Sequence, residues 1–255
     1  VLAAAEKVIL AYSGGLDTSV LVHWLKAQGV KDVVCVSGNY GQVKDVEALE
    51  KKAIASGASN FYCFDLREEF LTDYAFPTLQ AGAKYEGIYL LGTAIARPSI
   101  AKKLVEVAQQ EGINVIVHGC TGKGNDQVRF ELSILSLDEK MQVIAPWRFW
   151  EIKGRQEEIE YCVANNIPIT STPDDDYSED ENNWHISHEG MDLESLENEA
   201  NLDHMLAWSN KPEDAPDEAE YVTIEFDNGV PVKVDGENMA PIDLMDKLNT
   251  LGAKH

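Results

Sequence analysis

The sequence predicts an α/β fold: a doubly wound, mostly parallel sheet, followed by part of a second α+β domain. Three observations support this prediction. Short apolar segments alternate with helix-like segments up to Ile167, the composition changes after that residue, and a hairpin signal, Asn228-Gly229, appears near the end. Apolar runs with little polar alternation are typical of parallel strands buried on both faces. Because such strands alternate with helices, we expect ligands at the carboxyl ends of the strands.

The first domain is expected over residues 1–167. Its expected strands are rich in Val and Ile and are Lys7–Tyr12, Asp32–Ser37, Asn60–Asp65, Asn114–Gly119 and Gln142–Ala145. Its expected helices show helical periodicity, end near Gly or Asn, and are Asp17–Gln28, Val43–Ser56, Pro98–Glu111 and Gly154–Asn165.

The second domain is expected over residues 168–255. From Asp174 to Glu220 the chain is acidic and poor in aliphatic residues, with Lys211 as its only Lys or Arg, which predicts a long surface excursion. A hairpin and a final helix are expected next, over Tyr221–Phe226, Val230–Val234 and Pro241–Leu251. A two-stranded hairpin with one helix is thin, so we expect only part of a domain here.

The stretch from Ala11 to Ser19, AYSGGLDTS, joins the first expected strand directly to the first expected helix. Its two glycines let the backbone turn sharply, and the helix dipole directs its positive end at the same point. The stretch has no lysine between Gly14 and Ser19, unlike a Walker A loop, and its hydroxyl groups are neutral donors. A neutral cradle of this kind suits a pyrophosphate leaving group better than γ-phosphoryl transfer.

A second glycine-rich turn follows the strand expected at Asn114–Gly119. Lys123 and Arg129 can balance phosphate or carboxylate charge, while Asn125 and its neighbours can orient amide or ammonium groups. Since both turns follow strands of one sheet, we expect them to open onto one cleft. The alternative is a plain turn with a solvated basic residue.

The net charge is −23, from 44 acidic and 21 basic residues. Such a charge repels nucleic-acid phosphates and anionic membrane surfaces, so neither partner is expected. No apolar run approaches membrane-spanning length, and the start lacks the features of a signal peptide. A cytoplasmic protein is expected. The four cysteines are widely separated, which favours reduced thiols.

Several motifs resemble known enzymes. The strand, S-G-G-x-D-[ST]-S and helix arrangement resembles the PP-loop of AMP-forming ATP pyrophosphatases, which include GMP, NAD and asparagine synthetases. Segments that are similar to the argininosuccinate synthase family follow in order, at Tyr89–Pro98, His118–Glu131, Ala145–Arg148, Tyr177–Asn182 and His185–Ser187. The resemblance runs essentially from Lys7 to the final residue. It implies an adenine-nucleotide α-hydrolase-like domain with a PP-loop, then the first part of a synthetase domain.

The resemblance implies a reaction in two steps. The ureido oxygen of citrulline attacks the α-phosphate of ATP, giving citrullyl-AMP and pyrophosphate, and aspartate then displaces AMP to form argininosuccinate. The implied ATP site consists of Ala11, Tyr12, Ser13, Gly14, Gly15, Leu16, Asp17, Thr18, Ser19, Gly38 and Gly119. Ser13, Asp17 and Lys123 are expected to be catalytic. Mg²⁺ bridging phosphate oxygens would offset charge in the transition state.

The resemblance also assigns the amino-acid substrates. The implied aspartate site is Thr121, Asn125 and Asp126, with Asp126 taking the ammonium group. The implied citrulline site is Tyr89, Asn125, Arg129, Ser178 and Ser187. A carboxylate for an amine and a guanidinium for a carboxylate are the pairings expected from charge.

Simpler roles remain open for several of these residues. Asp17 is also a candidate helix cap, Tyr89 a packed aromatic, and Ser178 and Ser187 ordinary loop serines. No metal site made of side chains is expected, because His118, His185 and His188 show no metal-ligand spacing.

The chain departs from the family pattern at two places. Ala94 stands where some relatives carry a hydroxyl residue that contacts citrulline. The family also continues well beyond the segment at Lys247–His255, with further citrulline contacts, most of the synthetase domain and an oligomerising tail. A homotetramer is expected from the family, although that tail is absent here. Two alternatives stay open: a non-catalytic or partly active nucleotide-binding homologue, or another AMP-forming amide synthetase.

Overall fold

The computed structural model describes residues 5–122, 124–169 and 177–255. Its contacts divide the chain into two compact units. Unit 1 comprises Val1–Asn39, Val43–Asp65 and Ala96–Asp175, and unit 2 comprises Tyr40–Gln42, Leu66–Ile95 and Asp176–His255. The units are therefore not two consecutive halves, because Leu66–Ile95 groups with the later residues. The domain boundary expected after residue 167 stays a prediction.

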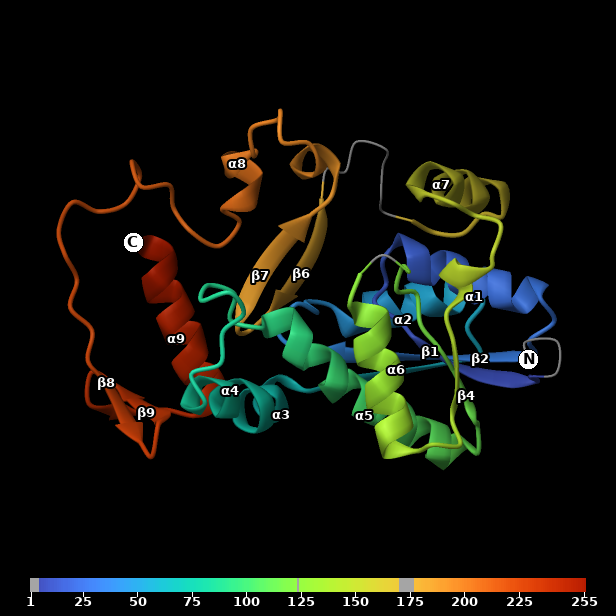
Figure 1. Cartoon of the computed structure of the whole chain (residues 1–255), viewed down its shortest axis with the longest axis horizontal. Coiled ribbons are helices and arrows are strands. Elements are labelled where there is room, and N and C mark those ends of the chain that lie inside the picture. Colours follow the sequence, from blue (N-terminus) through green and yellow to red (C-terminus); the bar gives the residue numbers. More distant parts are fainter. Residues whose placement is uncertain (1–4, 123, 170–176) are drawn as a thin grey trace. The chain divides into compact units, whose positions relative to one another are not determined.

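Unit 1 is built on a five-stranded sheet (Figure 1). Its strands are β1 (Lys7–Ala11), β2 (Asp32–Asn39), β3 (Asn60–Asp65), β4 (Val115–Val117) and β5 (Gln142–Ile144). All pairs are parallel, in the order β3-β2-β1-β4-β5, which confirms the predicted fold class. The order reverses between β1 and β4, and this reversal is where an open sheet of this kind leaves a crevice for ligands.

Helices cover both faces of this sheet. They are α1 (Leu16–Ala27), α2 (Val46–Ala55), α5 (Gly92–Glu111), α6 (Asp126–Leu137), η3 (Pro146–Arg148) and α7 (Arg155–Ala164). Figure 1 shows α1 and α2 on one side of the sheet and α5 and α6 on the other, as right-handed crossovers require. The side chains of Val8, Ile9 and Leu10 are fully buried, which explains why β1 carries no polar alternation.

Helix α5 begins at Gly92, so the prediction that it starts at Pro98 is wrong. Proline favours the first turn of a helix, because it has no N–H to donate. Here the N–H groups of Thr93 and Ala94 have an acceptor in the Tyr89 hydroxyl, at 3.1 and 3.3 Å. This side-chain contact allows the helix to begin earlier, with Pro98 inside it.

Unit 2 combines short helices with two small antiparallel sheets. Its elements are α3 (Arg67–Phe70), η2 (Leu71–Ala75), α4 (Phe76–Gln80), β6 (Ser178–Asn182), β7 (His185–Glu189), η4 (Met191–Glu194), α8 (Leu202–Met205), β8 (Ile224–Asp227), β9 (Val230–Val234), β10 (Glu237–Asn238) and α9 (Pro241–Lys254). The hairpin expected around Asn228-Gly229 is confirmed as β8 and β9, with both turn residues at positive φ.

The predicted surface excursion is wrong for residues 178–189, which form the hairpin β6–β7. The sequence SEDEN of β6 has no alternation of apolar residues, so it carried no strand signal. The turn is closed by Asn182, whose side-chain oxygen accepts from the N–H groups of Trp184 and His185 at 2.9 and 3.2 Å. Its amide nitrogen donates to the Gly92 carbonyl at 3.3 Å, which fixes the hairpin within unit 2. None of the helices in the described ranges has the length and apolar character needed to cross a membrane.

Candidate active site

The junction of β1 and α1 forms a sharp loop. Gly14 has φ +80°, a conformation that favours glycine, and a Cβ added there would lie 2.3 Å from Cδ1 of Leu49, whose side chain would have to move. Gly15 is the N-cap of α1. The N-terminal end of a helix with unsatisfied N–H groups therefore faces the loop, as phosphate binding requires.

Two hydroxyl groups lie together within this loop. Ser13 Oγ accepts from the Gly15 N–H at 3.2 Å and lies 3.2 Å from Thr18 Oγ1. Ser19 differs, because its hydroxyl is fully buried and donates to the Gly15 carbonyl at 2.8 Å. Ser13 is exposed and is therefore the better placed donor for a ligand, while Thr18, which is buried and donates to the Gly15 carbonyl at 3.4 Å, and Ser19 hold the start of α1.

Lys52 is a loop contact that the sequence did not reveal. This residue of α2 donates from Nζ to the Gly14 carbonyl at 2.6 Å. Partial burial lowers the pKa of Lys52 from its usual value. The loop that was predicted to be neutral thus has a cation beside it. No sequence motif connects Lys52 with the loop, because the two lie 38 residues apart.

Asp17 lies in the first turn of α1 and faces Glu158 of α7. Because Gly15 is the N-cap, Asp17 does not have the capping role that was left open. Burial raises the pKa of Asp17, against the lowering effects of a hydrogen bond with Glu158 and of the Arg155 charge. Burial and the Asp17 charge raise the pKa of Glu158 to about 9. The side chain of Glu158 is 1% exposed. At neutral pH it therefore keeps its proton, which it shares with Asp17 in a hydrogen bond.

The second glycine-rich turn lies next to the first loop. Strand β4 pairs with β1, and a Cβ added to Gly119 would lie 3.1 Å from Leu21 Cδ1 and 3.4 Å from Thr18 Cγ2. The absence of a side chain at Gly119 therefore permits the turn to approach α1. The two turns open at the same edge of the sheet, as expected, with Asn125 as N-cap of α6.

Two arginines form ion pairs with Asp126, one with each oxygen of its carboxylate. Arg97 Nε lies 2.7 Å from Oδ2 and Arg129 Nη1 lies 2.7 Å from Oδ1. Arg97 was not among the predicted site residues; it comes from α5, with no spacing that connects it to the turn. The trio carries a formal charge of +1, which suits the carboxylate of a substrate. Lys123 lies outside the described residues.

Replacing Asp126 with alanine should destabilise unit 1 by about 1–3 kcal/mol, because two partly buried guanidinium groups would lose their carboxylate. Urea denaturation measures this change. The matched control is Asp32→Ala, whose pair with Lys7 is exposed and 3.6 Å long, so a change within about 0.5 kcal/mol is expected there. Equal effects of the two substitutions would contradict the structural role given to Asp126.

His118 has a structural place beside this turn. Its ring is fully buried, and Nδ1 accepts from the Cys120 N–H at 3.2 Å. Burial lowers the pKa of His118. The ring is therefore neutral with its proton on Nε2, which lies 3.5 Å from Glu131 Oε1. His118 orients the backbone that follows β4.

The residues assigned to citrulline are divided between the two units. Asn125 and Arg129 belong to unit 1, whereas Tyr89, Ser178 and Ser187 belong to unit 2. The hydroxyl oxygen of Tyr89 already accepts two N–H groups of α5, which leaves its proton to offer a ligand. The two serines are part of β6 and β7 rather than of a loop. Their role in binding citrulline stays a prediction, as do the roles of Thr121 in the second turn and Gly38 in β2.

Comparisons with known proteins agree with this architecture. A family model described as arginosuccinate synthase N-terminal HUP domain matches residues 7–168, and one described as arginosuccinate synthase C-terminal domain matches residues 177–255. The argininosuccinate synthases of Clostridium perfringens (strain 13 / Type A) and Acetivibrio thermocellus are 55% and 53% identical over 250 residues. Each alignment covers 98% of this chain and 62% of the relative.

A solved structure, described as a predicted subunit of a tRNA methyltransferase from Methanocaldococcus jannaschii, is also similar. It has a TM-score of 0.40 and 18% identity, over 62% of this chain and 75% of that chain. That similarity supports no functional conclusion.

The chain spans about three fifths of the length of the curated relatives it matches. Because the two family models together match nearly all of it, the chain belongs to the argininosuccinate synthase family.

Proposed function

We propose that this chain acts in the ATP-dependent condensation of citrulline with aspartate, which yields argininosuccinate, AMP and pyrophosphate. The observation that supports this most directly is the pairing of β1 with β4, which brings a phosphate-type loop and a second polar turn to one edge of the sheet. Nucleotide and amino acids bound there would meet. Because the chain spans about three fifths of its relatives, activity and substrates are proposals for it.

The first loop would hold the phosphates of ATP. Ser13 would donate from its hydroxyl, and the N-terminus of α1 would supply backbone N–H groups and the positive end of its dipole. The hydrogen bond with Glu158 would favour the ionised form of Asp17, against the effect of burial. Mg²⁺ would enter bound to the phosphates, and the hydroxyl oxygens of the loop are of the oxygen type that Mg²⁺ takes as ligands. When bound, it would offset phosphate charge.

The second turn would orient aspartate. The positive trio of Arg97, Asp126 and Arg129 would attract a substrate carboxylate, and Asp126 would pair with the ammonium group as its own ion pairs rearrange. Catalysis would then consist chiefly of placement, which can contribute effective molarities of about 10⁵ M or more when the reacting groups are aligned. A homotetramer and a cytoplasmic location stay predictions.

The direct test incubates the chain with MgATP, citrulline and aspartate and measures pyrophosphate, AMP and argininosuccinate. We expect pyrophosphate release that depends on citrulline. ATP binding in calorimetry without any product would instead favour the non-catalytic alternative. Pyrophosphate release that is independent of citrulline would favour another AMP-forming synthetase. Absence of ATP binding would defeat the proposal altogether.

Lys52→Met should weaken ATP binding about tenfold, as the loss of one charge-assisted hydrogen bond to the loop predicts. Isothermal titration calorimetry measures the affinity. Lys51→Met is the matched control, because this neighbour on α2 is exposed and pairs with Glu47. An unchanged affinity in Lys52→Met would show that the cation beside Gly14 plays no part in nucleotide binding.

A further inference from the structure

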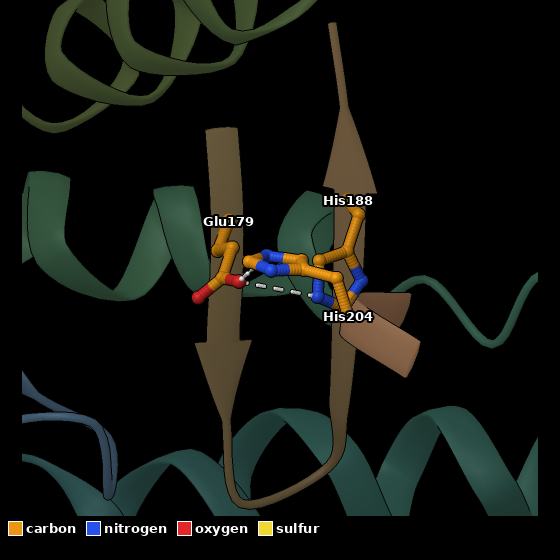
Figure 2. A group of neighbouring side chains, drawn as sticks. All are labelled: Glu179, His188 and His204. Atoms are coloured by element: carbon orange, nitrogen blue, oxygen red, sulfur yellow. Dashed lines mark hydrogen bonds and ion pairs between the residues drawn. The ribbon is translucent and has the colours of Figure 1, made fainter. Parts of the chain in front are cut away.

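Three side chains that no motif connects converge in unit 2: Glu179 of β6, His188 of β7 and His204 of α8 (Figure 2). His204 Nε2 lies 2.9 Å from Glu179 Oε1, and His188 Nε2 lies 3.3 Å from the same oxygen. One ligand atom from each residue lies within 4.8 Å of the other two. The sequence spacing predicted no metal site, because the third ligand comes from a separate element.

The fold places these groups without local sequence signals. Glu179 and His188 are direct partners across the β6–β7 ladder, so their side chains project from the same face of the hairpin. Figure 2 shows the imidazole of His204 reaching toward the Glu179 carboxylate from α8. The ring of Tyr177 packs near both imidazoles, with centroids 6.2 Å from His188 and 4.8 Å from His204. These ring contacts hold the two histidines in place.

The ion-pair contact with Glu179 leaves His188 without a hydrogen bond at Nε2 in the described part of the chain. Its side chain is 5% exposed, and its Nε2 atom is buried with no hydrogen-bond partner among the described residues. Buried imidazole nitrogens nearly always have a partner, because leaving one unsatisfied costs about 1–3 kcal/mol. The atom points into the cluster, close to a carboxylate oxygen that His204 also approaches. A ligand that accepts electron pairs from all three groups would satisfy it.

We propose that Glu179, His188 and His204 bind a divalent transition-metal ion of the zinc type. Ligand atoms at about 2.0–2.2 Å from a tetrahedral ion lie about 3.3 Å from one another, close to the 2.9 and 3.3 Å found here. Two imidazoles with one carboxylate suit zinc rather than Mg²⁺ or Ca²⁺, which prefer oxygen ligands. The fourth position is left for water. The chain's net charge of −23 further favours a cation.

The metal site is independent of the proposed reaction. Ser178 and Ser187, assigned to citrulline, occupy ladder positions whose side chains project from the opposite face of the hairpin, because successive residues of a strand alternate. A bound ion would join this hairpin to α8 and so brace unit 2 from behind the serine face. Its role is structural, and its binding stabilises the folded state by mass action.

The test uses the whole chain after treatment with a chelator. Calorimetric titration with Zn²⁺ and visible absorption with Co²⁺ should each show one equivalent bound, with cobalt bands typical of tetrahedral N and O ligands. Glu179→Gln and His204→Asn should each weaken Zn²⁺ binding by at least about tenfold. His255→Asn is the matched control, because His255 lies 3.1 Å from Glu220 without a third ligand group among the described residues.

Circular dichroism separates loss of binding from loss of folding. His204 is partly exposed on a short helix, so the His204→Asn chain should retain the spectrum of the unmodified chain. Thermal unfolding should occur at higher temperature with Zn²⁺ in the unmodified chain and be unchanged by Zn²⁺ in His204→Asn. Absence of stoichiometric Zn²⁺ or Co²⁺ binding would overturn the site, as would equal affinities of His204→Asn and His255→Asn. ATP binding is unaffected by either result, so a failure here does not bear on the proposed reaction.

Discussion

Gly14→Ala should lower the affinity for ATP on the order of 100-fold, equivalent to about 2.7 kcal/mol. Two physical effects combine at this position. The backbone has φ +80°, which costs an L-residue roughly 1–2 kcal/mol. The new Cβ would also lie 2.3 Å from Cδ1 of Leu49, so the Leu49 side chain would have to move. Both effects turn the loop away from the conformation in which its N–H groups face the phosphates. Calorimetry with ATP measures the loss.

A second substitution separates the two effects. In Gly14→Ala with Leu49→Ala the contact is removed while the positive φ remains, so we expect partial recovery of affinity. Gly29→Ala is the matched control: Gly29 has φ +93° and no atom within 4 Å of an added Cβ. It should lose about 1 kcal/mol of stability and none of its ATP affinity. ATP binding that is equal in Gly14→Ala and Gly29→Ala would refute the loop as the phosphate site.

Glu158→Gln should remove much of the pH dependence of stability between about pH 5 and pH 9. The folded-state pKa of Glu158 is raised to about 9, mainly by burial and then by the Asp17 charge. Over this range folded Glu158 keeps a proton that the unfolded chain has lost, so unfolding releases a proton and stability falls as the pH rises. The glutamine donates to Asp17 as protonated Glu158 does, but it does not titrate.

The expected gain from Glu158→Gln is about 5 kcal/mol at pH 9 and less than about 1 kcal/mol at pH 5. Urea denaturation over a pH series measures it. Glu160→Gln is the matched control on the same helix, because Glu160 is exposed, and it should leave the pH profile unchanged. Glu158→Ala should be less stable than Glu158→Gln at every pH, since Asp17 loses its donor. Parallel pH profiles for the unmodified chain and Glu158→Gln would show that the buried carboxyl group does not titrate as argued.

Local patterns were sufficient for the parallel sheet. The strands β1 and β2 lie inside the sheet with buried side chains, so their sequences are largely apolar runs whose meaning does not depend on distant residues. The Asn228-Gly229 turn was predictable for a related reason, because positive φ at both positions is a local requirement.

The hairpin β6–β7 was not predictable in this way. Its first strand is nearly all polar, and what holds it is backbone pairing with β7 and the contact of Asn182 with Gly92. Such contacts leave no periodic signal in the sequence. The same holds for Pro98, which has the preference of a helix start but lies inside α5 because the Tyr89 hydroxyl caps earlier N–H groups.

The sequence by itself determined the five-stranded α/β core, the loop at Gly14 and Gly15, and the polar turn after β4, because each depends on residues that are neighbours along the chain. Tertiary structure alone decided which side chains complete these places. Lys52 beside the loop, Glu158 beneath Asp17 and Arg97 against Asp126 come from other elements. Ion pairs, shared protons and metal ligands act over a few ångströms. Residues that are far apart in the sequence therefore give no local pattern for such a contact, which forms only when the fold brings the groups together.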